Sequence, residues 1–499
     1  MIRRDCEWLF PALLAAAVLG VVLSSRPTLD GHEVLVAQTA REMIASGDFL
    51  HPTFAGEPRL QKPPLAYWTC ALSFRLFGEN ETAARLPSAL AAVIGVALTA
   101  IFARRAFGPG MGWLAGCVQA TSLWTVAYGR LALVDAMLTT LISAAMLVAA
   151  WDRLGNRTDG RPWAWCIAPS FWTLCGLIAL AKGPVGLAML WPPVILYRWM
   201  RGKRETDASL LFHRSSIIGV ALFLVLSLAW PVAMLERYPE AWEVWTGQSL
   251  GRFQEHWGPQ TRPWWYFFVQ TPWLLFPWSV PLVIAAVRRP RIDLTDPHRL
   301  LLVAWFATVF LLCTLSAGKR AHYILPGLPA ACIFAALAVP RLSWRAPSVS
   351  GGRLTTSWAR VFRGVRLPTL TLPARPLVLL IALVEAVVYA AVVAPGQDMT
   401  GFRRMVERNQ ARLQQSSVVQ VGSRERATVF PVNRPMQWLA EPPASVAEPT
   451  LVLTPEKNLP EVLASGRAKV IDSAGPKRSR VERSPGGAFA LVELEPVRR

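Results

Sequence analysis

Residues 87–103 read PSALAAVIGVALTAIFA and contain no charged side chain. Arg85 precedes this run, and Arg104 and Arg105 follow it. A helix needs roughly 20 mainly apolar residues to cross the hydrocarbon core of a bilayer, which is about 30 Å thick. Basic side chains at the ends of such a run are typical of the headgroup region. The segment is therefore predicted to be a membrane-spanning helix.

Similar apolar runs recur over most of the chain. Its 499 residues are 53% hydrophobic and 17% charged, whereas a soluble protein carries about a quarter charged residues. We predict a mainly α, polytopic transmembrane protein with about eleven spans. The expected spans cover residues 8–25, 87–103, 111–128, 133–151, 164–181, 184–200, 215–234, 271–287, 300–316, 321–339 and 376–394.

The net charge of +20 is distributed unevenly. Basic side chains collect in the loops that follow the even-numbered spans, and the positive-inside rule therefore places these loops and the N-terminus in the cytoplasm. A nucleic-acid site would gather the charges on one soluble surface, so no nucleic acid is expected as a partner. The expected location is the cytoplasmic (inner) membrane, with its lipids as partners.

An odd number of spans places the tail, residues 395–499, on the outer face. The tail alternates β-rich runs, among them Ser417–Val421, Ala427–Val432 and Thr450–Leu453, with polar breaks. We therefore expect two domains, a transmembrane domain over 1–394 and a small C-terminal β or α/β extracytoplasmic domain over 395–499.

Two of the outer loops are long, about 26–86 and 235–270. The first contains two amphipathic stretches with helical spacing, Val34–Ile44 and Leu65–Phe77. We predict that both are helices lying in the membrane interface. The second loop is rich in tryptophan, which favours the headgroup level.

The first candidate cluster is Asp30, His32 and Glu33, where span one meets the first predicted interfacial helix. Two carboxylates and an imidazole lie within four residues. Either kind of group can act as a general base toward a hydroxyl. Alternatively, Asp30 is only the N-cap of the helix.

The second cluster contains Arg59, Gln61 and Lys62, followed by Tyr67. Lys62 can neutralise a lipid phosphate as a point charge. Tyr67 is a candidate support for a sugar or for an apolar chain. The alternative is a lysine that extends along the membrane surface among interfacial aromatics.

The third candidate, Asp135, begins a predicted span at its outer end. An ionisable residue at membrane depth points to a functional site. A helix cap or a salt bridge to Arg130 is the alternative.

The last cluster consists of groups on the outer side, against the positive-inside bias. They are candidates for binding a phosphate or an acidic lipid headgroup. They are Lys182, Arg252, His256, Lys319, His322 and Tyr323.

Over about residues 25–330, the order and spacing of the sequence motifs resemble those of the type C membrane glycosyltransferases. The likeness is greatest to the branch with the aminoarabinose transferase of lipid A and the protein O-mannosyltransferases. The motifs are H-E-x-x-x-A-x-x-A-R-E-M over 32–43, Gln61-Lys62-Pro63-Pro64-Leu65, Arg130 through Asp135, Lys182-Gly183-Pro184, Arg252-Phe253 and Tyr323-Ile324-Leu325-Pro326.

The resemblance implies a sugar donor linked to a polyprenyl monophosphate and a single inverting displacement on the outer face. The acceptor would be a hydroxyl of a glycolipid such as lipid A, or of a protein. Asp30, Glu33 and Asp135 are the expected catalytic residues, and the basic groups are expected to hold the donor phosphate.

The chain departs from the family pattern at two positions. His32 stands where the family usually has Asp, so the role of that Asp falls to Asp30, His32 or Glu33. Gln61 stands where the family usually has a Glu associated with a metal. Because a neutral amide is a poor metal ligand, no metal is expected, although His256 could contribute to one.

Two other functions are possible. A transporter or flippase of a polyprenyl-linked glycolipid would favour inverted repeats and broken helices near the midplane, whereas the polar residues here collect at one surface. The second alternative is a family member that binds the lipid-linked sugar but does not transfer it. The transferase interpretation requires Glu33, Lys62, Asp135 and Lys319 to converge in one cavity that opens outward.

Overall fold

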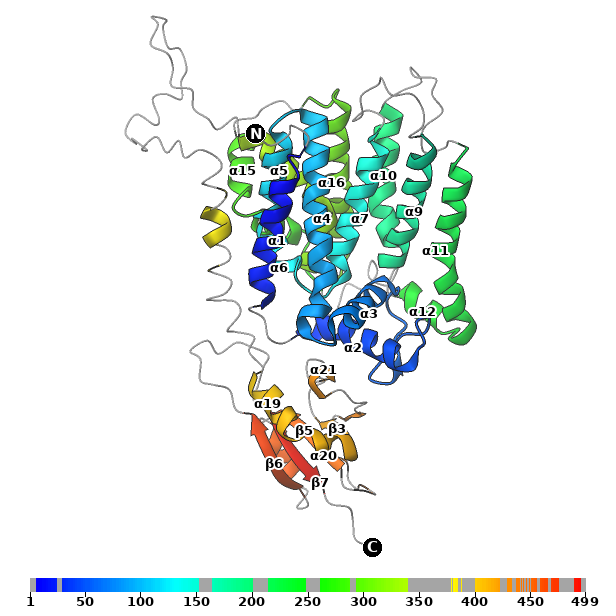
Figure 1. Ribbon diagram of the computed structural model, residues 1–499, viewed down its shortest axis with the longest axis vertical. Helices are drawn as coiled ribbons and strands as arrows, with labels where there is room; N and C mark the ends of the chain where they lie inside the picture. The colour runs from blue at the N-terminus through cyan, green and yellow to red at the C-terminus, as the bar shows by residue number, and fades with distance from the viewer. Residues whose placement is uncertain are drawn as a thin grey trace, which may run out of the picture.

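The computed structural model describes residues 6–24, 29–151, 164–200, 214–247, 261–287 and 293–339, and, with gaps, residues 378–494. Most of the apolar helices stand side by side along the long axis (Figure 1). They are α1 (Leu9–Ser24), α4 (Glu81–Phe107), α5 (Met111–Ala120), α6 (Leu123–Tyr128), α7 (Val134–Ala149), α9 (Ala164–Lys182), α10 (Pro184–Met200), α11 (Ser216–Arg237), α14 (Tyr266–Leu274), α15 (Ser279–Val287), α16 (Pro297–Leu315) and α17 (Leu328–Ala338).

Within the described residues, five helical segments are long and apolar enough to cross a membrane, or six if the bent pair α14–α15 counts as one span. The five are Glu81–Phe107, Trp165–Lys182, Ser216–Arg237, Pro297–Leu315 and Ala321–Ala338. The chain is therefore a mainly helical protein with several potential spans, and the total of eleven stays a prediction. The last expected span, 376–394, lies largely outside the described residues.

Two expected spans are broken. The run 111–128 forms α5 and α6, because the hydroxyls of Thr121 and Ser122 donate to the carbonyls of Cys117 and Val118 and compete with the helical hydrogen bonds. The run 271–287 forms parts of α14 and α15, which are bent by 118°. Pro277 between them has no amide hydrogen to continue a helix.

The two helix breaks satisfy each other's hydrogen-bonding groups. The amide of Leu123 donates to the carbonyl of Phe276 at 3.0 Å. The Nε1 of Trp278 donates to Oγ1 of Thr121 at 2.9 Å. Irregular backbone is tolerated at membrane depth only where protein groups replace the lost hydrogen bonds, and this contact does so.

Glycine allows close helix packing in the bundle. A Cβ on Gly176 of α9 would lie 2.8 Å from the Cβ of Leu226 on α11, and one on Gly219 of α11 would lie 2.8 Å from the Cα of Pro169 on α9. Such small-residue contacts are typical of membrane helices, whose association depends on close packing rather than on exclusion of water.

The first outer loop lies across one end of the bundle. Helices α2 (Gly31–Ser46) and α3 (Leu65–Phe77) coincide with the two stretches predicted to be helical. Figure 1 shows them between the upright helices and the C-terminal sheet. Between α2 and α3, a hairpin joins strands β1 (Thr53–Phe54) and β2 (Glu57–Pro58).

Tryptophan side chains and one carboxylate hold the segment between α2 and α3. The indoles of Trp68, Trp230 and Trp245 donate to carbonyls of this segment at 2.7, 3.0 and 2.6 Å. At the hairpin tip, the Glu42 carboxylate accepts from the amides of Ala55 and Gly56. The backbone that presents the second candidate cluster is therefore fixed from several helices.

The tail forms a five-stranded mixed sheet with the strand order β4-β3-β5-β7-β6. Strand β3 runs parallel to β4 and β5, and β7 runs antiparallel to β5 and β6. Its elements are α19 (Thr400–Arg408), α20 (Gln410–Gln415), β3 (Ser417–Val421), α21 (Val429–Val432), β4 (Gln437–Leu439), β5 (Thr450–Pro455), α22 (Leu459–Leu463), β6 (Ala468–Ala474) and β7 (Phe489–Leu494).

Of the expected strand 427–432, the described residues Val429–Val432 form the short helix α21 instead. It contains Pro431, which cannot donate to a strand ladder. The sheet packs against the first outer loop, and the division into two domains stays a prediction. Apolar side chains of α2 and α3 share one cluster with side chains of α19, β5 and β7.

Replacing Ala55 by Gly should stabilise the protein. Ala55 has a φ of 57°, a conformation that costs an L-residue about 1–2 kcal/mol. Gly removes this strain, but it also makes the unfolded chain more flexible, which lowers stability by about 0.4–1 kcal/mol. The midpoint of thermal unfolding in detergent should rise by a degree or two. Ala97→Gly within α4 is the control and should lower the midpoint. A lower midpoint for Ala55→Gly would contradict the strained turn.

Candidate functional site

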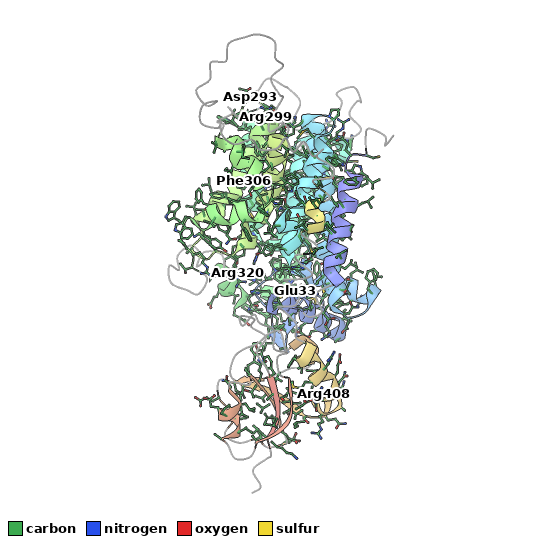
Figure 2. All side chains as sticks on the ribbon, turned by 90° about the vertical axis from the view of Figure 1, so that its left-hand side faces the viewer. Glu33, Asp293, Arg299, Phe306, Arg320 and Arg408 are labelled. Carbon is green, nitrogen blue, oxygen red and sulfur yellow. The ribbon has the colours of Figure 1, made fainter. Side chains whose placement is uncertain are left out.

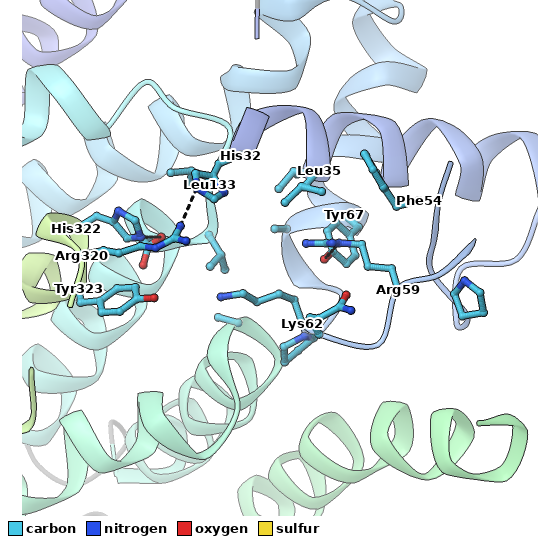
Figure 3. Close-up of a pocket in the computed structure, with 18 of the residues that line it drawn as sticks. His32, Leu35, Phe54, Arg59, Lys62, Tyr67, Leu133, Arg320, His322 and Tyr323 are labelled. Carbon is cyan, nitrogen blue, oxygen red and sulfur yellow. Dashed lines mark hydrogen bonds and ion pairs between the residues drawn. The ribbon is translucent and has the colours of Figure 1, made fainter. Parts of the chain in front are cut away.

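A cavity of about 420 Å³ lies where the first outer loop meets the ends of α7 and α9 and the segment before α17. Figure 3 shows side chains from these segments converging on it. Charged and aromatic side chains occur on both sides of it (Figure 3). The lining includes His32, Leu35, Phe54, Glu57, Arg59, Gln61, Lys62, Tyr67, Leu133, Asp135, Arg320, His322, Tyr323 and Trp438.

Asp135 is the centre of an ionic cluster on one wall. Its side chain is only 9% exposed, and Oδ1 accepts from Nζ of Lys182 at 2.6 Å. Nε2 of His322 lies 3.9 Å from Oδ2, and the Lys182 ammonium lies 4.8 Å from the ring centroid of Tyr323. Four predicted site residues from three chain segments therefore meet. Asp135 pairs with Lys182 rather than with Arg130, and the N-cap of α7 is Leu133.

The opposite wall presents the second cluster. Lys62 extends from the 57–64 segment toward the middle of the cavity (Figure 3). Nε of Arg59 donates to the hydroxyl of Tyr67 at 2.7 Å, and burial raises the pKa of that hydroxyl, so it remains protonated. Gln61 lines the cavity as expected. This wall offers cationic groups to an anionic ligand.

Asp30 and Glu33 have structural roles. Asp30 is the N-cap of α2: its Oδ1 accepts from the amides of His32 and Glu33, and the Glu33 carboxylate accepts from the Asp30 amide, which completes a capping box. Neither carboxylate lines the cavity. The catalytic role expected for them is therefore not supported by their position.

Glu33 is also the partner of Arg85 on α4. Its oxygens accept from Nε and Nη2 of Arg85 at 2.8 and 3.0 Å, and one accepts from the amide of Ala132 at 3.0 Å. Both side chains are fully buried. The Glu33 carboxylate is therefore enclosed by these donors and does not face the cavity.

Lys319 also differs from expectation. It is buried, it donates to the carbonyl of Ser316, and burial lowers the pKa of its ammonium group. Its neighbour Arg320 lines the cavity instead. Glu33 and Arg320 lie near the same end of the bundle (Figure 2), but of Glu33, Lys62, Asp135 and Lys319 only Lys62 and Asp135 reach the cavity. Arg252 and His256 lie outside the described residues.

Trp438 was not predicted from the sequence. It lies on β4 of the tail, lines the cavity and approaches the ring of Phe54 at 6.4 Å between centroids. A single tryptophan in a tail without other motifs carries no signal. Only the packing of the tail on α2 reveals that it forms part of the wall.

The residues do not fit a metal centre in the part of the chain that the structure describes. That part contains no group of three or more His, Cys, Asp or Glu side chains that could hold an ion. Gln61 offers a neutral amide, and Asp135 is engaged by Lys182.

Comparison with known proteins gives consistent matches. Residues 61–234 match the family model described as dolichyl-phosphate-mannose-protein mannosyltransferase. The undecaprenyl phosphate-alpha-4-amino-4-deoxy-L-arabinose arabinosyl transferase of Edwardsiella ictaluri is 28% identical over 68% of this chain and 61% of its own length. The corresponding protein of Aeromonas salmonicida is 29% identical over 67% of this chain and 60% of its own length.

The fold also has a counterpart among solved structures. The crystal structure of ArnT from Cupriavidus metallidurans bound to undecaprenyl phosphate aligns with a TM-score of 0.72 at 20% identity and covers 97% of each chain. These matches confirm the predicted resemblance to type C membrane glycosyltransferases of the aminoarabinose-transferase branch. The chain spans about three fifths of the length of the two sequence relatives.

Replacing Glu33 by Gln should destabilise the protein rather than affect chemistry selectively. The change leaves the buried Arg85 without its counter-charge, and breaking a buried pair in this way costs about 3–5 kcal/mol. Thermal unfolding in detergent should show a large fall in the midpoint. Glu79→Gln, which breaks the more exposed pair with Arg41, should change it little. A stable but inactive Glu33→Gln protein would contradict the structural role.

Proposed function

We propose that this chain, which resembles the aminoarabinose transferases, is a membrane glycosyltransferase that uses a polyprenyl monophosphate–sugar donor. The acceptor is a hydroxyl of a glycolipid such as lipid A, or of a protein. The supporting observation is the cavity at one end of an apolar bundle in which Asp135, Arg320 and His322 lie opposite Lys62 (Figure 3), with Lys182 bound to Asp135. A prenyl chain can reach such a site from the bilayer.

The cavity groups suit a displacement at a sugar carbon. The acceptor hydroxyl attacks the anomeric carbon opposite the phosphate, and the bond to the phosphate oxygen breaks with its electron pair on that oxygen. Lys62 and Arg320 stabilise the charge that develops on the leaving phosphate. Asp135 holds Lys182, and through it the Tyr323 wall, in position.

We place the reaction on the outer face of the cytoplasmic membrane. The cavity lies at the start of α4, whereas Arg104 and Arg105 lie at its other end. By the positive-inside rule the basic end is cytoplasmic, so the cavity and the tail lie outside.

The transporter alternative has less support. Broken helices occur, but the α5–α6 and α14–α15 breaks meet through the neutral Thr121 and Trp278, which bond to each other. Among the described residues, the charged side chains that line the cavity lie at one end of the bundle, as expected of an enzyme working at one membrane surface.

Replacing Lys62 by Ala should lower the rate of transfer by roughly 10²–10³, because one preorganised charge toward the leaving phosphate is lost. The assay measures transfer from a polyprenyl phosphate–sugar donor in proteoliposomes. Lys469→Ala, on the exposed side of β6, is the control and should transfer normally. Normal turnover of Lys62→Ala would remove Lys62 from the donor site.

Replacing Asp135 by Asn should reduce transfer by at least about 10²-fold, because Lys182 and His322 lose the carboxylate that positions them. The elution volume in detergent reports folding. If the single change unfolds the protein, Asp135→Asn combined with Lys182→Met removes the uncompensated charge and should restore folding but not transfer. Full activity of the Asn form would assign Asp135 to structure alone.

A further inference from the structure

His32 and Arg320 form a contact inside the cavity that the roles given above do not use. The Nε2 of His32 lies 2.7 Å from Nη1 of Arg320 (Figure 3). Both side chains line the cavity, and they come from α2 and from the segment before α17. A guanidinium is always charged and has only donors. The imidazole nitrogen therefore accepts, and His32 is neutral with its proton on Nδ1.

The carboxylates next to His32 are occupied. Asp30 caps α2, and Glu33 binds Arg85. Of the cluster 30–33, only the imidazole lines the cavity. Asp135 lines it as well, but its Oδ1 binds Lys182. Glu57 on β2 is the other carboxylate in the lining.

Accepting a proton and accepting the Arg320 hydrogen bond exclude each other at Nε2, because the nitrogen has one lone pair. A protonated imidazole beside the guanidinium would also be repelled. Nη1 of Arg320 must therefore move away from Nε2 before His32 can take a proton. The donor phosphate, bound in the same cavity, offers Arg320 an anionic partner.

We propose that Arg320 exchanges its hydrogen bond to His32 for one to the donor phosphate, and that the freed Nε2 of His32 is the base for the acceptor hydroxyl. This rests on the proposed function. The hydroxyl oxygen bonds to the anomeric carbon, and the bond from that carbon to the phosphate oxygen breaks with its electrons on the phosphate. The hydroxyl proton moves to Nε2 and later to water.

The exchange makes the base available only when a donor is present. Asp30 binds the amide of His32. The charged side chains and the second imidazole that line the cavity with His32 are Glu57, Arg59, Lys62, Asp135, Arg320 and His322. General-base assistance of this kind contributes about 10²–10⁴ to a rate.

The affinity for the donor phosphate tests the exchange without turnover. His32→Ala removes the competing acceptor, so Arg320 is available and polyprenyl phosphate in detergent micelles should bind about 3- to 10-fold more tightly. Adding Arg320→Ala should weaken the binding of polyprenyl phosphate both in the wild-type protein and in the His32→Ala variant. His298→Ala, in the first turn of α16 at the other end of the bundle, is the control. Weaker binding by His32→Ala would overturn the exchange, because it would mean that His32 positions Arg320 for the phosphate.

The rate of transfer tests the base. His32→Gln keeps an acceptor for Arg320 but cannot take the proton, so it should bind polyprenyl phosphate like the wild type and transfer about 10²–10³-fold more slowly. His32→Glu should keep part of the activity, with the acidic limb of the pH profile of kcat/KM at lower pH, because a carboxyl is the stronger acid. Near-normal transfer by His32→Gln, or an equal loss in Glu57→Gln, would overturn the assignment.

These two measurements separate the inference from the proposed function. If the wild type binds polyprenyl phosphate and the affinities shift as expected but no sugar is transferred, the proposed function fails and the exchange stands. If Lys62→Ala abolishes transfer while His32→Gln does not affect it, the transferase stands and the base assignment fails.

Discussion

The buried ion pair between Glu33 and Arg85 is the constraint on which the site depends. It joins the first turn of α2 to α4, and the third bond of Glu33, from the Ala132 amide, adds the segment that leads into α7. His32 precedes Glu33 on the same turn, and Asp135 follows Ala132 by three residues. Two walls of the cavity are therefore oriented by one carboxylate that never meets the substrate. A pair of this kind contributes specificity of arrangement more than net stability.

The wall that carries Arg59 and Lys62 is held in a different way. Charged residues on a hairpin and a loop would be mobile in isolation, but three indole N–H groups and the Glu42 carboxylate hold the backbone between α2 and α3. Lys62 and Arg59 therefore enter the cavity from a rigid support. Catalysis by preorganised charge requires such rigidity, since a charge that must reorient at the moment of reaction loses much of its effect.

The apolar runs and the ordered motifs predicted the helical membrane fold, the two helices of the first outer loop and several residues that line the cavity. Periodicity could not show where a run would break, because the breaks at Thr121 and Pro277 depend on each other across the bundle. Nor could composition tell Glu33 from a catalytic carboxylate, since its partner Arg85 lies on another helix. Lys319 and Arg320 are adjacent, and only the backbone direction before α17 decides which one faces the cavity. The wall formed by Trp438 depends on how the tail packs.

The shared cluster of α2, α3 and the C-terminal sheet has a consequence for biosynthesis. The apolar faces around Val34 and Phe74 leave the ribosome well before their partners around Phe402 and Phe489. Contacts so distant in sequence form slowly, and an apolar surface that waits for its partner is prone to wrong associations. During synthesis, the nascent first loop therefore remains without its final cover until the tail has been made, and the cavity, whose lining includes Trp438 of the tail, cannot be completed before then.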